Sequence, residues 1–412
     1  MMEEIKRLTE VADKCINCGF CESVCPTYAP AEFISSFSAR GRMLIGKELS
    51  KEIAVGKRIS KDVSDYYYSC LGCNACLQVC PAKINAGEVS DLVRKLVVEG
   101  KTFESKQRKM IAEMIVHTTM KYNNPLGLKK ELALWARGLS FFDDSPILFY
   151  TGGMYQMMPY SQTLSDLQIR FGPFLSSAMA RLFNRFLFAI KVSKLLGKKS
   201  EVDKYNSTLK DIYTLLSNSG VKLSYLWEDE PYPGTFINDL GYTQEFKSYA
   251  SRVTELFKSK GIREIVVVDP HTYQLMKYEY PKVVPEFDLK VTYYLDKLDR
   301  GILKRKAGSV TYHEPCLIAR GIENYEIPFE ILNSVAKVKL PRRNGKNTSC
   351  CGGPDGLLFP SIAKKISEER SRELKREKSD RIVSLCPICI SHLGVNVEIT
   401  DLSTFLIEAT NH

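Results

Sequence analysis

The spacing of the cysteines constrains this chain more than any other feature of its sequence. All thirteen cysteines fall into three groups, and none lies between Pro81 and Pro315. The first two groups share the spacing C-x-x-C-x-x-C-x-x-x-C-P, and they are Cys15, Cys18, Cys21 and Cys25, and Cys70, Cys73, Cys76 and Cys80. The reactive chemistry is therefore confined to two regions near the ends of the sequence.

Both motifs favour iron–sulfur clusters over a single metal ion. Three thiolates at three-residue steps bind three corners of a cubane [4Fe–4S] cluster, and a distant fourth thiolate completes the site. Structural zinc uses C-x-x-C pairs and gives no reason for a third step or a trailing proline. In two-cluster ferredoxins the fourth cysteine crosses over. That rule assigns Cys15, Cys18, Cys21 and Cys80 to one cluster, and Cys70, Cys73, Cys76 and Cys25 to the other.

The third group has a different pattern, with two adjacent thiols at its centre. It consists of Cys316, Cys350, Cys351, Cys386 and Cys389. Neighbouring side chains reach one tetrahedral ion poorly but can bridge or bind different irons, so a multi-iron cluster is favoured. A vicinal redox disulfide and buried free cysteines are the alternatives. Gly352 and Gly353 follow directly, and we expect them to let backbone approach the cluster and to leave room for a small ligand.

Length, cysteine count and net charge limit the cellular compartments and the kinds of partner that we expect for this chain. A disulfide scaffold is typically short and secreted, whereas this chain has 412 residues, an odd number of cysteines and no apolar leader after MMEEIK. We therefore expect a cytoplasmic protein, either free or peripheral on the inner face of the membrane through a partner subunit. Its net charge of +10 is not concentrated in a tail, and no nucleic-acid partner is expected.

The hydrophobic pattern predicts a multidomain protein. Residues 1–140 read as an α-helical two-cluster ferredoxin domain, and residues 141–300 and 301–412 read as two α/β lobes. Helices are predicted at 43–54, 87–99, 205–217, 244–258 and 361–376. Strands are predicted at 147–150, 221–226, 264–268, 291–295, 310–313, 335–340 and 381–385.

The two lobes read as a repeat in which only the second keeps its cysteines. Ile147–Gly153, Tyr232–Gly234 and Ile265–Thr272 match the three cysteine-bearing segments of the second lobe, and the spacings agree: 35 residues separate Pro233 from Asp269, and 34 separate Cys351 from Cys386. The first lobe also contains a basic, amphipathic insertion near 154–198, which reads as a surface helix or as a docking element for a membrane subunit.

The third cysteine group resembles the CCG domain of the B-type and D-type subunits of heterodisulfide reductase, shared with iron–sulfur subunits of glycolate oxidase and anaerobic glycerol-3-phosphate dehydrogenase. The paired ferredoxin motifs, the stretch Ser38–Arg42 and the two lobes recur in the order of the D-type subunit. The resemblance implies that the five cysteines hold a noncubane [4Fe–4S] cluster. The first lobe departs from that pattern, because its corresponding positions are Gly153, Tyr232, Pro233, Asp269 and Thr272. We expect no cluster there.

Four polar residues accompany these sites. His313 and His392 lie beside cluster cysteines, where either could shuttle protons or serve only as a hydrogen-bonding neighbour. The histidine that usually follows the first CCG cysteine in the family is Leu317 here. Asp269 and His271 occupy the vestigial ligand corner of the first lobe and could face the remaining cluster across the lobe interface.

Two functions fit the pattern. In the first, the chain is a disulfide reductase-like oxidoreductase whose cubane clusters exchange single electrons with a catalytic noncubane cluster acting on a thiol or disulfide. In the second, it is a relay between a flavoprotein dehydrogenase and a membrane cytochrome b or quinone-linked subunit. No GxGxxG run is present, so a flavin would have to lie on another chain.

Metal analysis tests the cluster assignment. Anaerobically prepared protein should contain about twelve irons per chain, from three four-iron clusters, with negligible zinc. Replacing Cys350 and Cys351 together by serine should remove about four of them, because each ferredoxin motif supplies its own thiolates. A content near eight irons in the unmodified chain would rule out the third cluster.

Overall fold

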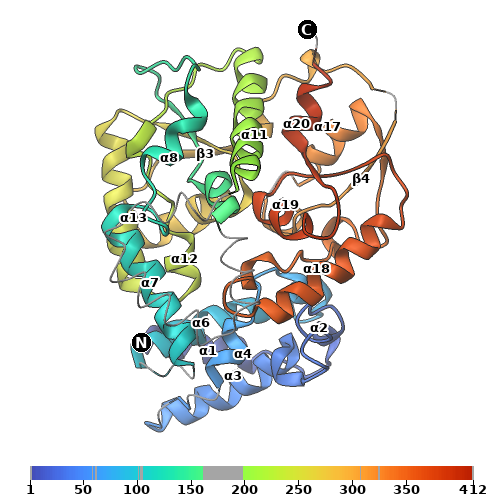
Figure 1. Ribbon diagram of the computed structural model, residues 1–412. Coiled ribbons are helices and arrows are strands. Elements are labelled where there is room, and N and C mark those ends of the chain that lie inside the picture. The colour runs from blue at the N-terminus through green and yellow to red at the C-terminus, as the bar shows by residue number, and fades with distance from the viewer. Residues whose placement is uncertain are drawn as a thin grey trace.

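A computed structural model describes residues 2–57, 59–60, 63–100, 102, 105–160, 198–306, 308–322 and 325–410. Three bodies meet at the centre of the molecule (Figure 1): a helical unit in blue, a green and yellow lobe, and an orange and red lobe. Most of the insertion expected at 154–198, namely 161–197, lies outside the described residues. Among the described residues, no helix combines the length and the apolar character needed to cross a membrane.

The helical unit surrounds the two ferredoxin motifs. Its three longer helices pack against one another. Gly46 permits the closest approach, since a Cβ there would lie 2.8 Å from Cγ1 of Val89. The predictions at 43–54 and 87–99 are confirmed. The helices are α1 (Met2–Asp13), α2 (Phe20–Ser23), α3 (Ala39–Ala54), α4 (Ser64–Tyr68), α5 (Ala75–Val79) and α6 (Ala86–Gly100).

The next helices pack mainly on the first lobe. Helix α7 (Lys106–Tyr122) contacts α12 (Thr235–Asp239) and α13 (Thr243–Ser259), and a short helix α8 (Lys130–Ala133) follows it. Arg108 of α7 also pairs with Asp65 of α4 and donates to the carbonyl of Leu358. Trp135 then donates a hydrogen bond to Tyr225 Oη at 3.0 Å. The helical region expected to extend to residue 140 is thus divided, with α1–α6 around the motifs and the remainder mainly on the lobe.

The first lobe contains a parallel sheet in the order β1–β2–β3. Ile147 of β1 pairs with Glu264 of β2, which in turn pairs with Lys290 of β3. The strand predicted at 221–226 is wrong: only Ser224 forms a bridge, to Leu148, and the chain then enters a turn at Trp227, whose φ is 55°. The lobe comprises β1 (Ile147–Tyr150), α11 (Lys199–Asn218), β2 (Glu264–Val267), α14 (Pro270–Gln274), α15 (Tyr280–Val283) and β3 (Lys290–Tyr293).

The second lobe has a parallel sheet in the order β5–β4–β6–β7. The two sheets have the same strand order if the segment at Ser224, which bridges to β1, is counted as an edge strand of the first sheet. That segment then corresponds to β5, which pairs with β4 in the second lobe. The strands are β4 (Ser309–Tyr312), β5 (Lys337–Lys339), β6 (Arg381–Ser384) and β7 (Thr400–Asp401). The helices are α16 (Cys316–Gly321), α17 (Ile327–Val335), α18 (Pro360–Lys375), α19 (Pro387–Leu393) and α20 (Leu402–Ile407).

The helical unit meets the first lobe through a close backbone contact. Arg94 of α6 donates to the carbonyl of Asp239 at 3.0 Å, and Tyr68 Oη donates to the carbonyl of Leu240 at 2.9 Å. Gly241 follows with a φ of +88°, and a Cβ there would lie 2.7 Å from the carbonyl carbon of Arg94. Only glycine fits both the backbone conformation and the space at this position.

A pair of glycine variants tests this contact. Gly241→Ala should lower the free energy of unfolding by about 2 kcal/mol or more, because it adds a steric clash to the left-handed strain. Gly261→Ala is the control, since Gly261 has a φ of +72° with nothing within 4 Å of an added Cβ. It should cost only about 1 kcal/mol. Equal losses in chemical denaturation would show that the contact with Arg94 contributes nothing.

Candidate functional site

The two ferredoxin motifs form loops that depend on left-handed backbone at matching positions. In the first motif these positions are Asn17 and Gly19, with φ of 58° and 83°. In the second they are Gly72 and Asn74, with φ of 61° and 56°. Glycine and asparagine are the residues that adopt this conformation most readily. The loops therefore curl each set of three cysteines around a common centre.

The fourth cysteine of each motif lies beside the first three cysteines of the other motif. One small cavity is lined by Cys15, Cys18, Cys21 and Cys80, and a second by Cys25, Cys70, Cys73 and Cys76. This is the grouping that the crossover rule predicts from the sequence. The first cavity lies near the surface, where Cys18 is exposed, whereas Cys73 and Cys76 of the second are buried.

The donors around the second cavity suit a negatively charged cluster. Arg42 lies fully buried and places Nη1 3.6 Å from Cys25 Sγ. Its remaining donors hold the surrounding backbone and hydroxyl groups, including Tyr66 O at 2.6 Å. Burial raises the pKa of the Cys73 and Cys76 thiols to about 12. A bound cation such as iron would be needed to hold these sulfurs as thiolates.

The third cysteine group forms one continuous cluster of buried thiols. Cys351 Sγ and Cys389 Sγ lie 3.3 Å apart. The Cys350 and Cys351 sulfurs accept backbone N–H groups from Gly352 at 3.5 Å and Gly353 at 3.4 Å. Among the described residues, no three His, Cys, Asp or Glu side chains are arranged to hold one metal ion. A row of neighbouring thiols from several cysteines suits a cluster with more than one metal atom.

His271 of the first lobe reaches this thiol cluster, as we expected from the sequence for a residue at the lobe interface. Cys386 caps the N-terminus of α19. Although burial opposes it, hydrogen bonds from Cys389 and His271 lower the pKa of Cys386 to about 5. Burial lowers the pKa of His271, but the hydrogen bond to Cys386 and the charge of that thiolate outweigh this effect and raise the pKa to about 9. Asp269 does not reach the thiols; it caps α14 by accepting from His271 N and Thr272 N, each at 3.0 Å.

The two glycines after Cys351 do not leave open space, which corrects the expectation from the sequence. A Cβ at Gly353 would lie 2.3 Å from Cγ2 of Ile388, and one at Gly352 would lie 3.0 Å from Cβ of Ile366. Protein side chains fill the volume that a ligand was expected to use. These glycines are required for packing, and access to the thiols has to come from another side.

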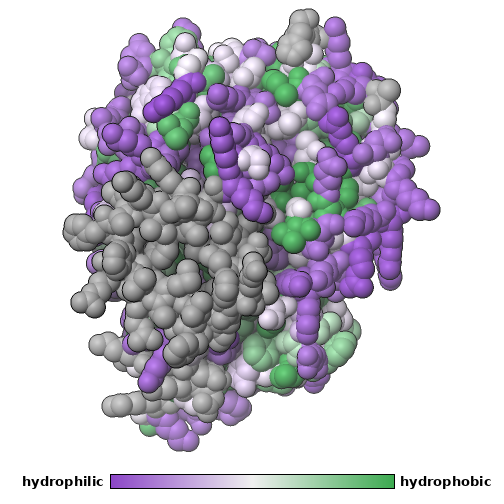
Figure 2. Space-filling view, in the orientation of Figure 1, coloured by the Kyte–Doolittle hydropathy of each residue, from purple (hydrophilic) through white to green (hydrophobic). Residues whose placement is uncertain are grey.

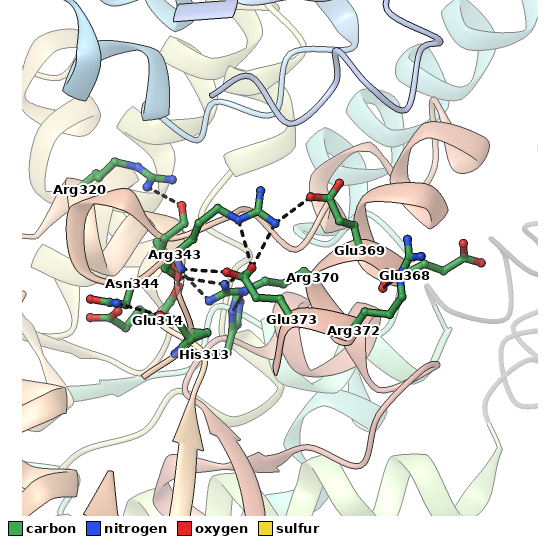
Figure 3. Close-up of polar contacts among 12 residues, drawn as sticks. His313, Glu314, Arg320, Arg343, Asn344, Glu368, Glu369, Arg370, Arg372 and Glu373 are labelled. Carbon is green, nitrogen blue, oxygen red and sulfur yellow. Dashed lines mark hydrogen bonds and ion pairs between the residues drawn. The ribbon is translucent and has the colours of Figure 1, made fainter. Parts of the chain in front are cut away.

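The two histidines expected near the cluster have structural partners. Figure 3 shows His313 joined to Arg370, whose Nε donates to His313 Nδ1 at 3.1 Å, while Nη1 binds Glu373 at 2.7 Å. Burial, and then the charge of Arg370, hold the pKa of His313 well below its usual range. A neutral ring fixed in this way is a poor proton shuttle. His392 Nδ1 contacts the carbonyl of Cys351 at 2.9 Å and positions that loop.

The second cavity and the third thiol group are in direct contact. Cys73 packs with Cys316 and Cys350 in one buried cluster. Arg320 fastens them together, because its Nε donates to the carbonyl of Cys73 at 2.6 Å and its Nη1 to that of Thr348 at 2.8 Å. Sequence reasoning missed Arg320. Its only signal was its place four residues after Cys316, about one helical turn along α16.

A larger cavity of about 500 Å³ lies where all three bodies meet. Its lining includes Cys70 from the second ferredoxin loop, His271 and Gln274 from the first lobe, and Asp355 and Ile388 from the second. This cavity approaches the third thiol group from the side of His271. Its lining reaches the neighbours of these thiols, Leu317, Ile388 and His271, while the five thiols themselves stay buried behind them.

Comparison with known proteins agrees with this division of sites. A 4Fe–4S dicluster domain matches residues 11–84, and a cysteine-rich CCG domain matches residues 310–394. The chain thus contains a 4Fe–4S dicluster domain followed by a cysteine-rich domain, and it is similar to iron–sulfur subunits of oxidoreductases. The resemblance to the D-type subunit of heterodisulfide reductase and to the glycolate oxidase iron–sulfur subunit, expected from the motifs, is confirmed.

Three relatives illustrate the range of this group. The D-type subunit of a dihydromethanophenazine:CoB–CoM heterodisulfide reductase from Methanosarcina acetivorans is 22% identical, covering 98% of this chain and 97% of the relative. A probable glycolate oxidase iron–sulfur subunit from Bacillus subtilis is 22% identical, covering 97% and 94%. An EtfAB:quinone oxidoreductase from Syntrophomonas wolfei is 23% identical, covering 94% and 55%. The chain thus spans about half the length of some curated relatives.

The buried arginine beside Cys25 yields a test of its electrostatic role. Arg42→Gln should make the reduction potential of the second cubane cluster more negative, because it removes a positive charge and a hydrogen bond to sulfur. Arg40→Gln is the matched control, since Arg40 lines the first cavity instead. Redox titration followed by electron paramagnetic resonance separates the two clusters. A shift of the second potential only in the Arg40 variant would contradict the assignment.

Proposed function

We propose that the chain passes single electrons through three clusters in a line and uses the last of them for thiol and disulfide chemistry. The first cubane is bound by Cys15, Cys18, Cys21 and Cys80, and the second by Cys70, Cys73, Cys76 and Cys25. The noncubane cluster is bound by Cys316, Cys350, Cys351, Cys386 and Cys389. The observation that carries the proposal is the buried contact of Cys73 with Cys316 and Cys350, which joins the second site to the third.

The reaction consumes two electrons and two protons and cleaves one sulfur–sulfur bond to give two thiols. The clusters, when bound, supply one-electron storage; the protein determines which molecules approach them. The first site supports entry from a partner, because Cys18 is exposed there and the thiols of the third site are buried. The cavity beside His271 supports substrate entry at the opposite end of the line.

The first lobe serves in this proposal as a wall and not as a metal site. Asp269 takes the N-cap position on α14 that Cys386 takes on α19, and both are followed by proline at the first helical position. The first lobe therefore keeps the strand-to-helix turn that carries Cys386 in the second lobe, but it has Asp269 in place of the cysteine. We place the degenerate lobe at 141–300 and the cluster-bearing lobe at 301–412.

The electron-transfer partner is proposed to be a flavoprotein, a membrane cytochrome b or a quinone-linked subunit. Exposed apolar side chains lie around the first site, namely Ile16, Phe20 and Leu44. Figure 2 shows apolar surface gathered at the lower right of the molecule, over the region of α2. Such a patch suits a transient protein interface. The chain would then act in the cytoplasm or on the inner membrane face through its partner.

A second function, a relay without catalysis, is favoured by one observation. All five thiols of the third group are buried, and side chains fill the space beside Gly352 and Gly353. A relay needs only close, rigid cofactors and no open coordination position. In that case the third cluster would pass electrons between a flavoprotein dehydrogenase and a quinone-linked partner.

Thiol binding separates the two functions. If the third cluster is catalytic, a small thiol added to the oxidised protein should produce a new paramagnetic signal that broadens when the iron is enriched in a magnetic isotope. A Cys316→Ser variant should lose or alter that signal, because it changes the cluster itself. Indifference to every thiol and persulfide, together with rapid reduction by a co-purified flavoprotein, would establish the relay.

A further inference from the structure

The large cavity where the three bodies meet, termed the junction cavity, has a chemical character that neither proposed function explains. Its volume of about 500 Å³ is large enough for a small organic ligand. Leu317 and Ile388 form an apolar part of its wall, and each is adjacent in sequence to a thiol of the third group, Cys316 and Cys389. A ligand that fills the cavity therefore contacts the side chains that separate it from the thiol cluster.

Charge in the cavity is unbalanced toward the negative. Its lining contains five carboxyl groups and three permanently cationic side chains, together with His271, whose pKa of about 9 makes it a fourth cation at neutral pH. Several are already paired, such as Lys282 with Glu279 at 2.7 Å. Arg94 directs its donors to the backbone carbonyls of Tyr67, Cys70 and Asp239 and to Asp91. The carboxyl groups are Glu88, Asp91, Asp239, Glu279 and Asp355, and the permanent cations are Arg94, Lys95 and Lys282.

Two acceptors on the wall are buried and lack a donor. Asp355 is only 3% exposed, and its Oδ2 has no hydrogen-bond partner among the described residues. Gln274 Oε1, contributed by α14 of the first lobe, is also buried and has no hydrogen-bond partner among the described residues. A buried acceptor without a donor costs about 1–3 kcal/mol, and more when it is charged. Burial raises the pKa of Asp355 to about 7, which reflects that cost.

We propose that this cavity binds a thiol or disulfide that carries an ammonium or guanidinium group, and that Asp355 and Gln274 accept its N–H donors. The cationic group would occupy the Asp355 and Gln274 side, while the sulfur end would contact Leu317 and Ile388 beside the thiol cluster. The sulfur part of this inference rests on the proposed function. The cationic part rests on the cavity alone.

Three probes of nearly equal length separate these two parts. Cystamine carries two ammonium groups and a disulfide, hydroxyethyl disulfide keeps the disulfide without charge, and hexamethylenediamine keeps both charges without sulfur. Calorimetric titration uses the cluster-containing full chain at about pH 8, where Asp355 is ionised and the amines stay protonated. Cystamine should bind about tenfold or more tightly than hydroxyethyl disulfide, the range for a hydrogen bond to a charged group.

The diamine distinguishes failure of the proposed function from failure of this inference. Binding of hexamethylenediamine as tight as that of cystamine would retain the cation site while removing the preference for sulfur. Equal affinity for cystamine and hydroxyethyl disulfide, or tighter binding of the neutral probe, would overturn the inference in the unmodified protein. That comparison requires no variant.

Two variants then assign the cationic recognition to Asp355. Asp355→Asn should abolish the preference for cystamine over hydroxyethyl disulfide while iron content remains unchanged. Glu279→Gln removes the same charge from the same cavity, but its carboxylate is already paired with Lys282. It should leave most of the preference intact. An equal loss in both variants would show that only the general field of the cavity acts, and would overturn the role of Asp355.

Discussion

The hydrogen bonds of Arg320 hold together the two halves of this molecule on which its chemistry depends. One end of the guanidinium binds the carbonyl of Cys73 in the second ferredoxin loop, and the other binds the loop that precedes Cys350. Electron transfer between clusters requires short and rigid separations, and side-chain packing alone would allow the loops to slide. A multi-donor cation that binds two backbone carbonyls prevents this and places no negative charge beside the thiols.

Positive charge recurs beside the buried cysteines, with Arg42 and Arg94 buried and Arg320 half-buried. Arg42, Arg94 and Arg320 each direct their donors to carbonyl or hydroxyl oxygens close to the cysteine loops. Such arginines are costly to bury unless every donor is satisfied. Here the irregular loops around the thiols offer backbone carbonyls that accept from these arginines, and Nη2 of Arg320 is the donor that stays without a partner among the described residues. The loops gain order and the sulfurs gain a favourable potential from the same residues.

The first lobe, which has no cysteine, keeps the fold of the second lobe and contributes a side chain to the third thiol group. Its sheet order matches that of the cluster-bearing lobe, and Asp269 preserves the cap of the corresponding helix. Its carboxylate accepts two free N–H groups at the start of α14, as N-cap residues of this type do. An Asp in place of the Cys at this corner is therefore compatible with the same local fold. His271 then extends from this cap to Cys386, so the first lobe still contributes a side chain to the third site.

Local patterns in the sequence were sufficient for the five predicted helices, for six of the predicted strands and for the grouping of the ferredoxin cysteines around two cavities, but they missed α1 and α7. Each of the correct predictions depends on spacing within a short segment or on a general rule for ferredoxin loops. The strand at 221–226 failed because its pairing ends at Ser224, and pairing is decided by neighbouring strands. The space beside Gly352 and Gly353 was misjudged because Ile366 and Ile388, from other segments, fill it. Only the tertiary structure brings His271 to Cys386, Arg320 to Cys73, and Asp355 and Gln274 to one cavity, since contacts between distant segments leave no periodic trace in the sequence.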